Sequence, residues 1–159
     1  MIVAHPYLQQ CLQEQACIID HFSVCARFMA PAISFAKDRT FHIPHGIHPP
    51  DFAYIGRSHY GNGLNAVSVG SGQFDPSFFD ATSVLFPEVT FHVIGSGHTG
   101  KECANVRWYT EMPFKATLPY IAHAPVGTAP YRPGAHRPYV AQPSLKRVPF
   151  QTWGIPGVD

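Results

Sequence analysis

The sequence predicts an α/β fold built on a Rossmann-like parallel sheet flanked by helices. The main support is the stretch 65–97, NAVSVGSGQFDPSFFDATSVLFPEVTFHVIGSG, which has the strand, Gly-rich turn, helix and second strand of one βαβ unit. Its first strand, 66–69, carries no charge, as is typical of a parallel strand covered on both faces. Strand-like segments at 105–109 and 126–129 continue the alternation, which favours a doubly wound sheet with right-handed crossovers.

Composition limits the classes of function. The chain has 159 residues, 45% of them hydrophobic and 13% charged, as expected of one globular domain or one domain with an added piece. Its net charge of +1 gives no basic footprint for nucleic acid. The four cysteines form no CxxC pair, and we find no signal peptide and no apolar run of roughly 20 residues that could span a bilayer. These features predict a cytoplasmic protein with reduced thiols.

The first part of the chain is expected to alternate helices and strands. Weakly amphipathic residues 7–16 predict a helix, and CIIDHFSVC at 17–25 predicts a short buried strand. A second helix over 27–37 would be disturbed by Pro31, and 40–43 predicts another strand. The proline cluster PHGIHPP and the tract GRSHYGNG then indicate a boundary. We therefore expect a first part at 1–46, a linker at 47–64 and a main domain at 65–159.

Three histidines near this boundary suggest a metal site at first sight. His42, His45 and His48 recur every third residue, which would nearly align them on a helix. Pro44 and Gly46 exclude that helix, and no Cys or carboxylate cluster completes a ligand set. The favoured interpretation is loop histidines that hydrogen-bond the linker backbone, so no metal is expected.

The central unit contains the first candidate binding residues. Gly70, Ser71 and Gly72 follow the strand, and Asp75 with Pro76 suits the start of a helix. Glycines let a ligand approach the backbone, and the helix N-terminus favours an anion, so a phosphate-bearing ligand is predicted. An ordinary tight turn is an equal alternative for either glycine turn alone. The apolar face of this helix is expected to comprise Phe78, Phe79, Val84, Leu85 and Phe86.

The remaining segments place further loops at the same edge of the sheet. Pro113 starts a helix over 114–123 in which Pro119 is an expected kink, and 144–153 predicts a helix that contains Pro149, with a strand beginning at IPGV. The loops at 70–73, 95–97, 110–112 and 130–139 should all open at the carboxyl ends of the strands. The last of them carries Tyr131, Arg132, His136 and Arg137, with Lys146 on the helix behind.

Several stretches together resemble one enzyme family. The stretches are FHIPHGI, AVSVGSGQFDPSFF, FPEVTFHVIGSG, the pair EM, YIAHAPVGTAPY, and SLK ahead of WGIPGV. Over about residues 18–158, the chain is similar to GumK-type glucuronosyltransferases of exopolysaccharide assembly. The resemblance implies a GT-B fold with two Rossmann-like domains. This chain would be the C-terminal, donor-binding half, truncated at both ends, with residues 1–46 resembling the end of the N-terminal acceptor domain. It implies transfer of glucuronate from UDP-glucuronate to a lipid-linked, mannose-containing oligosaccharide without a metal or other cofactor.

The resemblance also assigns residues. The EM pair falls on Glu111 and Met112, where the family holds the uridine, and Tyr131 and Lys146 fall where it engages the diphosphate. Gly72 stands where the family has a bulkier residue, which would open one wall of the pocket. The acceptor site and its general base would precede Met1, so no catalytic residue is expected in this chain, and donor binding without turnover is predicted.

Two classes of function remain at this point. The first is the donor-binding portion of an inverting glycosyltransferase, cytoplasmic or peripheral at the inner face of the membrane. The second is a non-catalytic or degenerate nucleotide-binding or interaction module. We also expect self-association, because a truncated domain would leave Phe150, Trp153 and Ile155 uncovered.

Overall fold

The computed structural model describes residues 6–53, 55–97, 100–132 and 147–158. It divides the chain into two compact units, one formed by the described residues up to Gly46 and the other by those from Ile47 onward. None of the described helices is long and apolar enough to cross a bilayer.

The first unit is a small two-stranded motif. Its elements are α1 (Pro6–Glu14), the 3₁₀ helix η2 (Ala16–Ile18), β1 (Phe22–Val24), the 3₁₀ segment η3 (Arg27–Arg39) and β2 (Thr40–His42), with β1 and β2 parallel. The strand predicted over 17–25 is therefore wrong for all but Phe22–Val24. Arg39 donates from Nη2 to the Ala16 carbonyl at 2.7 Å and also reaches the Ile19 carbonyl, which holds the preceding segment in a turn.

The helix predicted over 27–37 forms only as 3₁₀ turns. Ile33 and Ala36 leave the helical region, with φ/ψ of −120/35° and −125/30°. Pro31 lies within the segment and has no backbone N–H to donate, as expected of a residue that interrupts an α-helical hydrogen-bond ladder. The predicted disturbance at Pro31 is confirmed.

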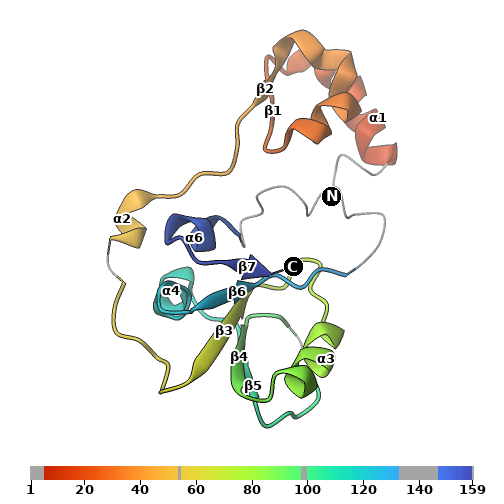
Figure 1. Cartoon of the computed structure of the whole chain (residues 1–159). Helices are drawn as coiled ribbons and strands as arrows, with labels where there is room; N and C mark the ends of the chain where they lie inside the picture. Colours follow the sequence, from red (N-terminus) through yellow and green to blue (C-terminus); the bar gives the residue numbers. More distant parts are fainter. Residues whose placement is uncertain (1–5, 54, 98–99, 133–146, 159) are drawn as a thin grey trace. The chain divides into compact units, whose positions relative to one another are not determined.

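The second unit contains a five-stranded parallel sheet in the order β5-β4-β3-β6-β7 (Figure 1). The parallel α/β fold class predicted from the sequence is confirmed. Its elements are α2 (Pro49–Phe52), β3 (Leu64–Val69), α3 (Ser77–Leu85), β4 (Val89–Ile94), β5 (Val106–Tyr109), α4 (Phe114–Ala122), β6 (Val126–Thr128), α6 (Arg147–Thr152) and β7 (Gly157–Val158). In the centre of the sheet, Ala66 of β3 pairs with Phe91 of β4 and with Val126 of β6.

Helices cover both faces of this sheet, α3 on one and α4 with α6 on the other (Figure 1). Successive residues of β3 point to opposite faces, so Ala66 packs under α3 and Val67 under α4. The core on the α3 face comprises Ala66, Phe74, Phe79, Phe91, Val93 and Val106. The core on the α4 face comprises Val67, Ile94, Ile121, Ala124 and Phe150.

Helix α3 begins as predicted but buries less than predicted. Asp75 Oδ1 accepts hydrogen bonds from the Ser77 backbone N–H at 3.0 Å and from its hydroxyl at 2.7 Å, which forms a local turn where the helix begins, whereas the N-cap position itself is Pro76. Phe79 is buried together with Ser83, one turn later. The prediction that Val84 and Leu85 belong to the buried apolar face is wrong. A short helix buries one stripe of side chains, and Val84 and Leu85 are 78% and 69% exposed.

The C-terminal apolar residues are covered, contrary to expectation. Phe150 of α6 is buried in the core, and Trp153 lies against Phe52 of α2 with ring centroids 5.0 Å apart. Ile155 packs partly buried on the same core. Pro149 falls in the first turn of α6, where backbone N–H groups lack intrahelical acceptors, so the helix forms around it. These three residues therefore give no reason to expect self-association.

The segment predicted as a linker, 47–64, packs on the second unit. It contains α2, where Asp51 pairs with Lys115 at 3.0 Å and with His48 at 3.4 Å. Further along, the Tyr60 hydroxyl donates to the Tyr120 carbonyl. Leu64, the last residue of the segment, is the first of β3.

Candidate functional site

The loops that follow four parallel strands meet at the carboxyl edge of the sheet. They are residues 70–76 after β3, 95–97 after β4, 110–113 after β5 and 129–132 after β6. Because the strands are parallel, all four loops leave the sheet at the same edge, which is where open α/β sheets bind ligands.

Glycines turn the chain sharply at the first two of these loops. Gly70, Gly95 and Gly97 have φ of 93°, 65° and 71°, in the left-handed region that favours glycine. The Gly70 N–H donates to the Ile94 carbonyl at 2.9 Å, which holds the end of β3 against the end of β4. By contrast, a Cβ added at Gly72 would meet no atom within 4 Å, so this position is open.

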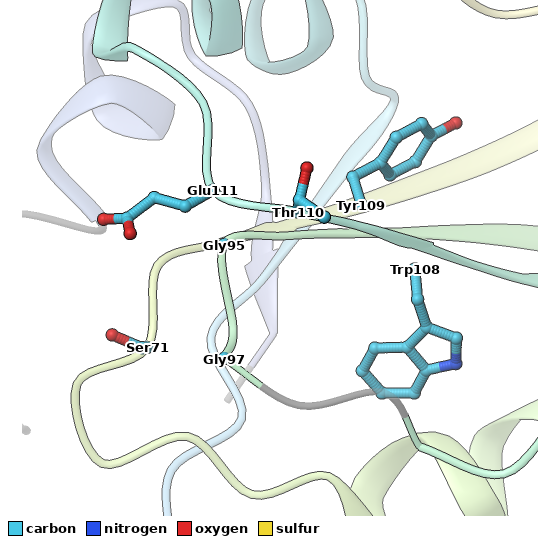
Figure 2. Close-up of a pocket in the computed structure, with 7 residues that line it drawn as sticks. All are labelled: Ser71, Gly95, Gly97, Trp108, Tyr109, Thr110 and Glu111. Atoms are coloured by element: carbon cyan, nitrogen blue, oxygen red, sulfur yellow. The ribbon is translucent and has the colours of Figure 1, made fainter.

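A cavity of about 380 Å³ lies at this edge. Figure 2 shows the side chains of Ser71 and Glu111 extending in the same direction, while Trp108 and Tyr109 point to opposite faces of the sheet. We call this space the Glu111 cavity; it is lined by Ser71, Gly95, Gly97, Trp108, Tyr109, Thr110 and Glu111. It thus brings together two residues predicted from sequence, Ser71 and Glu111, which are 40 positions apart in the chain.

The other predicted residues lie elsewhere or outside the described chain. Met112 packs, partly buried, against the core on the α4 face. Tyr131 forms an isolated antiparallel bridge with Phe74, which ties the loop after β6 to the loop after β3. Lys146, like His136 and Arg137, lies outside the described residues.

Sequence reasoning did not single out a second cavity of about 230 Å³, lined by Ser71, Gln73, Phe74 and Arg132. We call it the Arg132 cavity. The Arg132 backbone N–H donates to the Gln73 carbonyl at 2.8 Å, and its Nε donates to the Phe74 carbonyl at 3.0 Å. Ser71 lines both cavities. The one feature of the sequence that could have indicated Arg132 as a site residue is its place directly after Tyr131, in a loop predicted to open at the ligand-binding edge of the sheet.

A buried polar network supports the end of β5. His92 of β4 lies 3.0 Å from the Tyr109 hydroxyl through Nδ1 and 3.0 Å from Asn65 Oδ1 through Nε2. Asn65 donates from Nδ2 to the Gly63 carbonyl, which orients its Oδ1 as the acceptor. His92 Nε2 must then carry the proton, and Nδ1 accepts from the Tyr109 hydroxyl.

This network is held in its neutral form. Burial, and secondarily the charge of Arg107, lowers the pKa of His92 below its ordinary value. Burial also raises the pKa of Tyr109, with a further contribution from Tyr120. A neutral imidazole and a neutral phenol therefore fix the position of Tyr109, which lines the Glu111 cavity.

The groups at this edge are suited to holding a ligand that bears hydroxyl and anionic groups. The Glu111 carboxylate can accept from ligand hydroxyls, the glycine turns allow close approach of a ligand to the backbone, and Arg132 supplies a cation. Within the described ranges, no three His, Cys, Asp or Glu side chains lie close enough to hold a metal ion.

Comparison with known proteins finds a relative with an assigned activity. No known protein-family profile matches the chain. The chain is, however, 37% identical over 155 residues to the UDP-glucuronate:glycolipid 2-beta-glucuronosyltransferase of Xanthomonas campestris pv. campestris. The predicted resemblance is confirmed. The match covers 96% of this chain and 38% of that enzyme, so the chain spans less than half the length of its relative.

Proposed function

We propose that this chain is the donor-binding portion of a glycosyltransferase and that it holds a UDP-sugar, UDP-glucuronate in particular. The observation that carries the proposal is the convergence of Ser71 and Glu111 on one cavity at the carboxyl edge of a parallel sheet. The 37% identity to an enzyme named for UDP-glucuronate supports this choice of donor.

Each group has a role that follows from its chemistry. Glu111 accepts hydrogen bonds from the ribose hydroxyls, and the nucleoside lies in the Glu111 cavity. Ser71 and the turn that follows it hold the diphosphate. Tyr131 and Lys146 also act on the diphosphate, where the lysine ammonium offsets the charge that builds up on the leaving UDP. The site as proposed uses no metal.

The acceptor and the full reaction belong to the same proposal. The relative is named for a glycolipid acceptor, and we propose a lipid-linked acceptor for the protein to which this chain corresponds, with peripheral attachment to the membrane. An inverting transfer also needs a base that deprotonates the acceptor hydroxyl. We assign that role to no residue of this chain, and expect it to bind donor without appreciable transfer.

Calorimetric titration with UDP and with uridine tests the nucleotide site. Saturable binding of UDP, with weaker binding of uridine, is the expected result. Glu111→Gln should weaken both ligands roughly tenfold, because the carboxylate contacts the part that they share. Glu88→Gln is the matched control, since Glu88 is an exposed residue next to the start of β4, at the opposite edge of the sheet. Absence of saturable UDP binding would instead favour a degenerate module.

A second variant tests the diphosphate contact. Lys146→Ala should weaken UDP about ten- to a hundredfold, as expected for a charge-assisted contact. Uridine, which has no phosphate, should bind with nearly unchanged affinity. Equal losses for the two ligands would indicate damage to the fold, and unchanged UDP binding would show that this lysine does not reach the diphosphate.

A further inference from the structure

The Arg132 cavity holds a positioned cation at the ligand edge. Two contacts place Arg132: its backbone N–H donates to the Gln73 carbonyl and its Nε donates to the Phe74 carbonyl. With Nε engaged, the two terminal nitrogens of the guanidinium remain available to a ligand. In the part of the chain that the structure describes, no carboxylate forms an ion pair with Arg132.

The other lining residues are neutral. Ser71 and Gln73 contribute a hydroxyl and an amide, and Phe74 closes one wall. The nearby carboxylate of Asp75 accepts hydrogen bonds from the backbone N–H and the hydroxyl of Ser77. The cavity therefore combines one guanidinium with neutral hydrogen-bonding groups. A planar guanidinium fork matches a carboxylate, which it can hold through two parallel hydrogen bonds.

The position of Ser71 relates this cavity to the nucleotide site. Ser71 lines both cavities, so a ligand with its nucleoside in the Glu111 cavity reaches the Arg132 cavity after passing Ser71. The turn Ser71–Phe74 lies at this junction, closed by a hydrogen bond from the Phe74 N–H to the Ser71 carbonyl at 3.2 Å. The part of a sugar nucleotide that follows its diphosphate is the sugar.

Arg132 is more than the structural tie between the two loops. The loops after β3 and β6 are already joined by the Phe74–Tyr131 bridge and by the hydrogen bond from the Asp75 N–H to the Pro130 carbonyl at 3.1 Å. The guanidinium is thus an additional group on an already fixed backbone, and its exposure leaves it open to a ligand.

We propose that Arg132, with Ser71 and Gln73 beside it, forms a subsite for the carboxylate of a uronate donor. This inference rests on the proposed function and deepens it: the subsite would let the chain distinguish an acidic sugar nucleotide from its neutral counterpart. UDP-glucuronate and UDP-glucose differ only at the sugar C6, a carboxylate in one and a hydroxymethyl group in the other, so their comparison isolates this contact.

The test is calorimetric titration of the whole chain with UDP, UDP-glucose and UDP-glucuronate. Unmodified protein should bind UDP-glucuronate about ten- to a hundredfold more tightly than UDP-glucose. Arg132→Gln should abolish that preference and leave the affinities for UDP and UDP-glucose unchanged. Arg132→Lys should retain part of the preference, because it keeps the charge and loses the planar fork. Arg57→Gln, at an exposed arginine outside both cavities, should behave as the unmodified protein.

Three results would overturn the inference. Equal affinity of the unmodified protein for UDP-glucose and UDP-glucuronate would show that the carboxylate is not recognised. A loss of UDP affinity in Arg132→Gln equal to the loss for UDP-glucuronate would assign Arg132 to the diphosphate or to the fold. Absence of UDP binding in the unmodified protein would overturn the proposed function, and this inference with it; in the first two cases the proposed function stands.

Discussion

Replacement of Gly127 by alanine should destabilise the second unit through a single contact. Gly127 lies in β6, and its backbone packs against the ring of Phe150 from α6. A Cβ built at this position would lie 2.7 Å from each of the three nearest ring carbons, whereas ordinary van der Waals contact begins at 3.4 Å. Either the ring or the strand must move, and Phe150 is 3% exposed in a packed core, so neither moves freely.

The expected loss is that of an overpacked core. Overpacking typically costs about 1–3 kcal/mol, and each kcal/mol lowers the melting temperature of a chain of this size by about 2–4 °C. Urea denaturation and thermal unfolding measure the two quantities. Gly61→Ala is the matched control, because Gly61 has no positive φ and its added Cβ would meet no atom within 4 Å. It should leave stability unchanged or raise it by about 0.4–1 kcal/mol.

A double-mutant cycle identifies the cause. Phe150→Leu removes the ring that the new Cβ would strike, so it should cost less in the Gly127→Ala background than alone. A coupling free energy of about 0.5 kcal/mol or more is expected for two residues in contact. The reasoning is refuted if Gly127→Ala is as harmless as Gly61→Ala, or if the two losses simply add.

Three further substitutions or titrations test local features. The free energy of unfolding should fall as pH drops from 7 toward 5, because the pKa of His92 is lowered in the folded state and the unfolded chain takes up the proton first. His92→Gln should flatten this pH dependence in denaturation curves. An unchanged slope would show that His92 is not the group that causes it. Gln73→Gly should raise the free energy of unfolding, measured by urea denaturation, by about 1 kcal/mol, because Gln73 has a φ of 55° that strains any side chain. A decrease would show that the contacts of the Gln73 side chain outweigh this strain. Asn105→Ala should lower the free energy of unfolding by about 1–3 kcal/mol, since Asn105 Nδ2 lies 3.0–3.1 Å from the carbonyls of three residues, Ser83, Phe86 and Val89. Asn62→Ala, at an exposed asparagine, should have no comparable effect in the same assay.

The central unit could be predicted because its local signals agree. The second strand expected in the βαβ unit is β4, and the first, expected at 66–69, lies within β3. Gly70 and Gly95 mark the strand ends through their backbone angles, and Asp75 marks the start of α3 through its hydrogen bond from the Ser77 N–H. These features depend on conformational preferences of residues close together in the chain, which sequence reveals directly.

The first unit shows where such signals fail. Residues 17–25 are apolar enough for a strand, but apolar character alone does not distinguish a short strand from a short helix or turn. Arg39, which lies 23 positions after Ala16, donates a hydrogen bond to the Ala16 carbonyl and holds this segment in a turn. No pattern within 17–25 contains that information.

The candidate site shows the same division. Ser71 and Glu111 could be predicted, Ser71 from its place after a strand and Glu111 from the resemblance to a known family. Arg132 could not be assigned a cavity, because its position depends on hydrogen bonds to Gln73 and Phe74 across two loops. Met112, the neighbour of Glu111, packs partly buried against the core on the α4 face, a contact that depends on the assembled sheet and helix.

By itself the sequence determined the parallel α/β class, the order along the chain of the strands and helices from β3 onward, and the edge of the sheet at which its loops open. These follow from short-range preferences and from the requirement that parallel strands be joined by crossovers. Only the tertiary structure decided that Phe150 enters the core, that His92 joins Asn65 to Tyr109, and that Ser71 borders two cavities. Those contacts join residues far apart in the chain, and their free energy arises from packing and from desolvated hydrogen bonds that form only once the sheet and its helices are assembled.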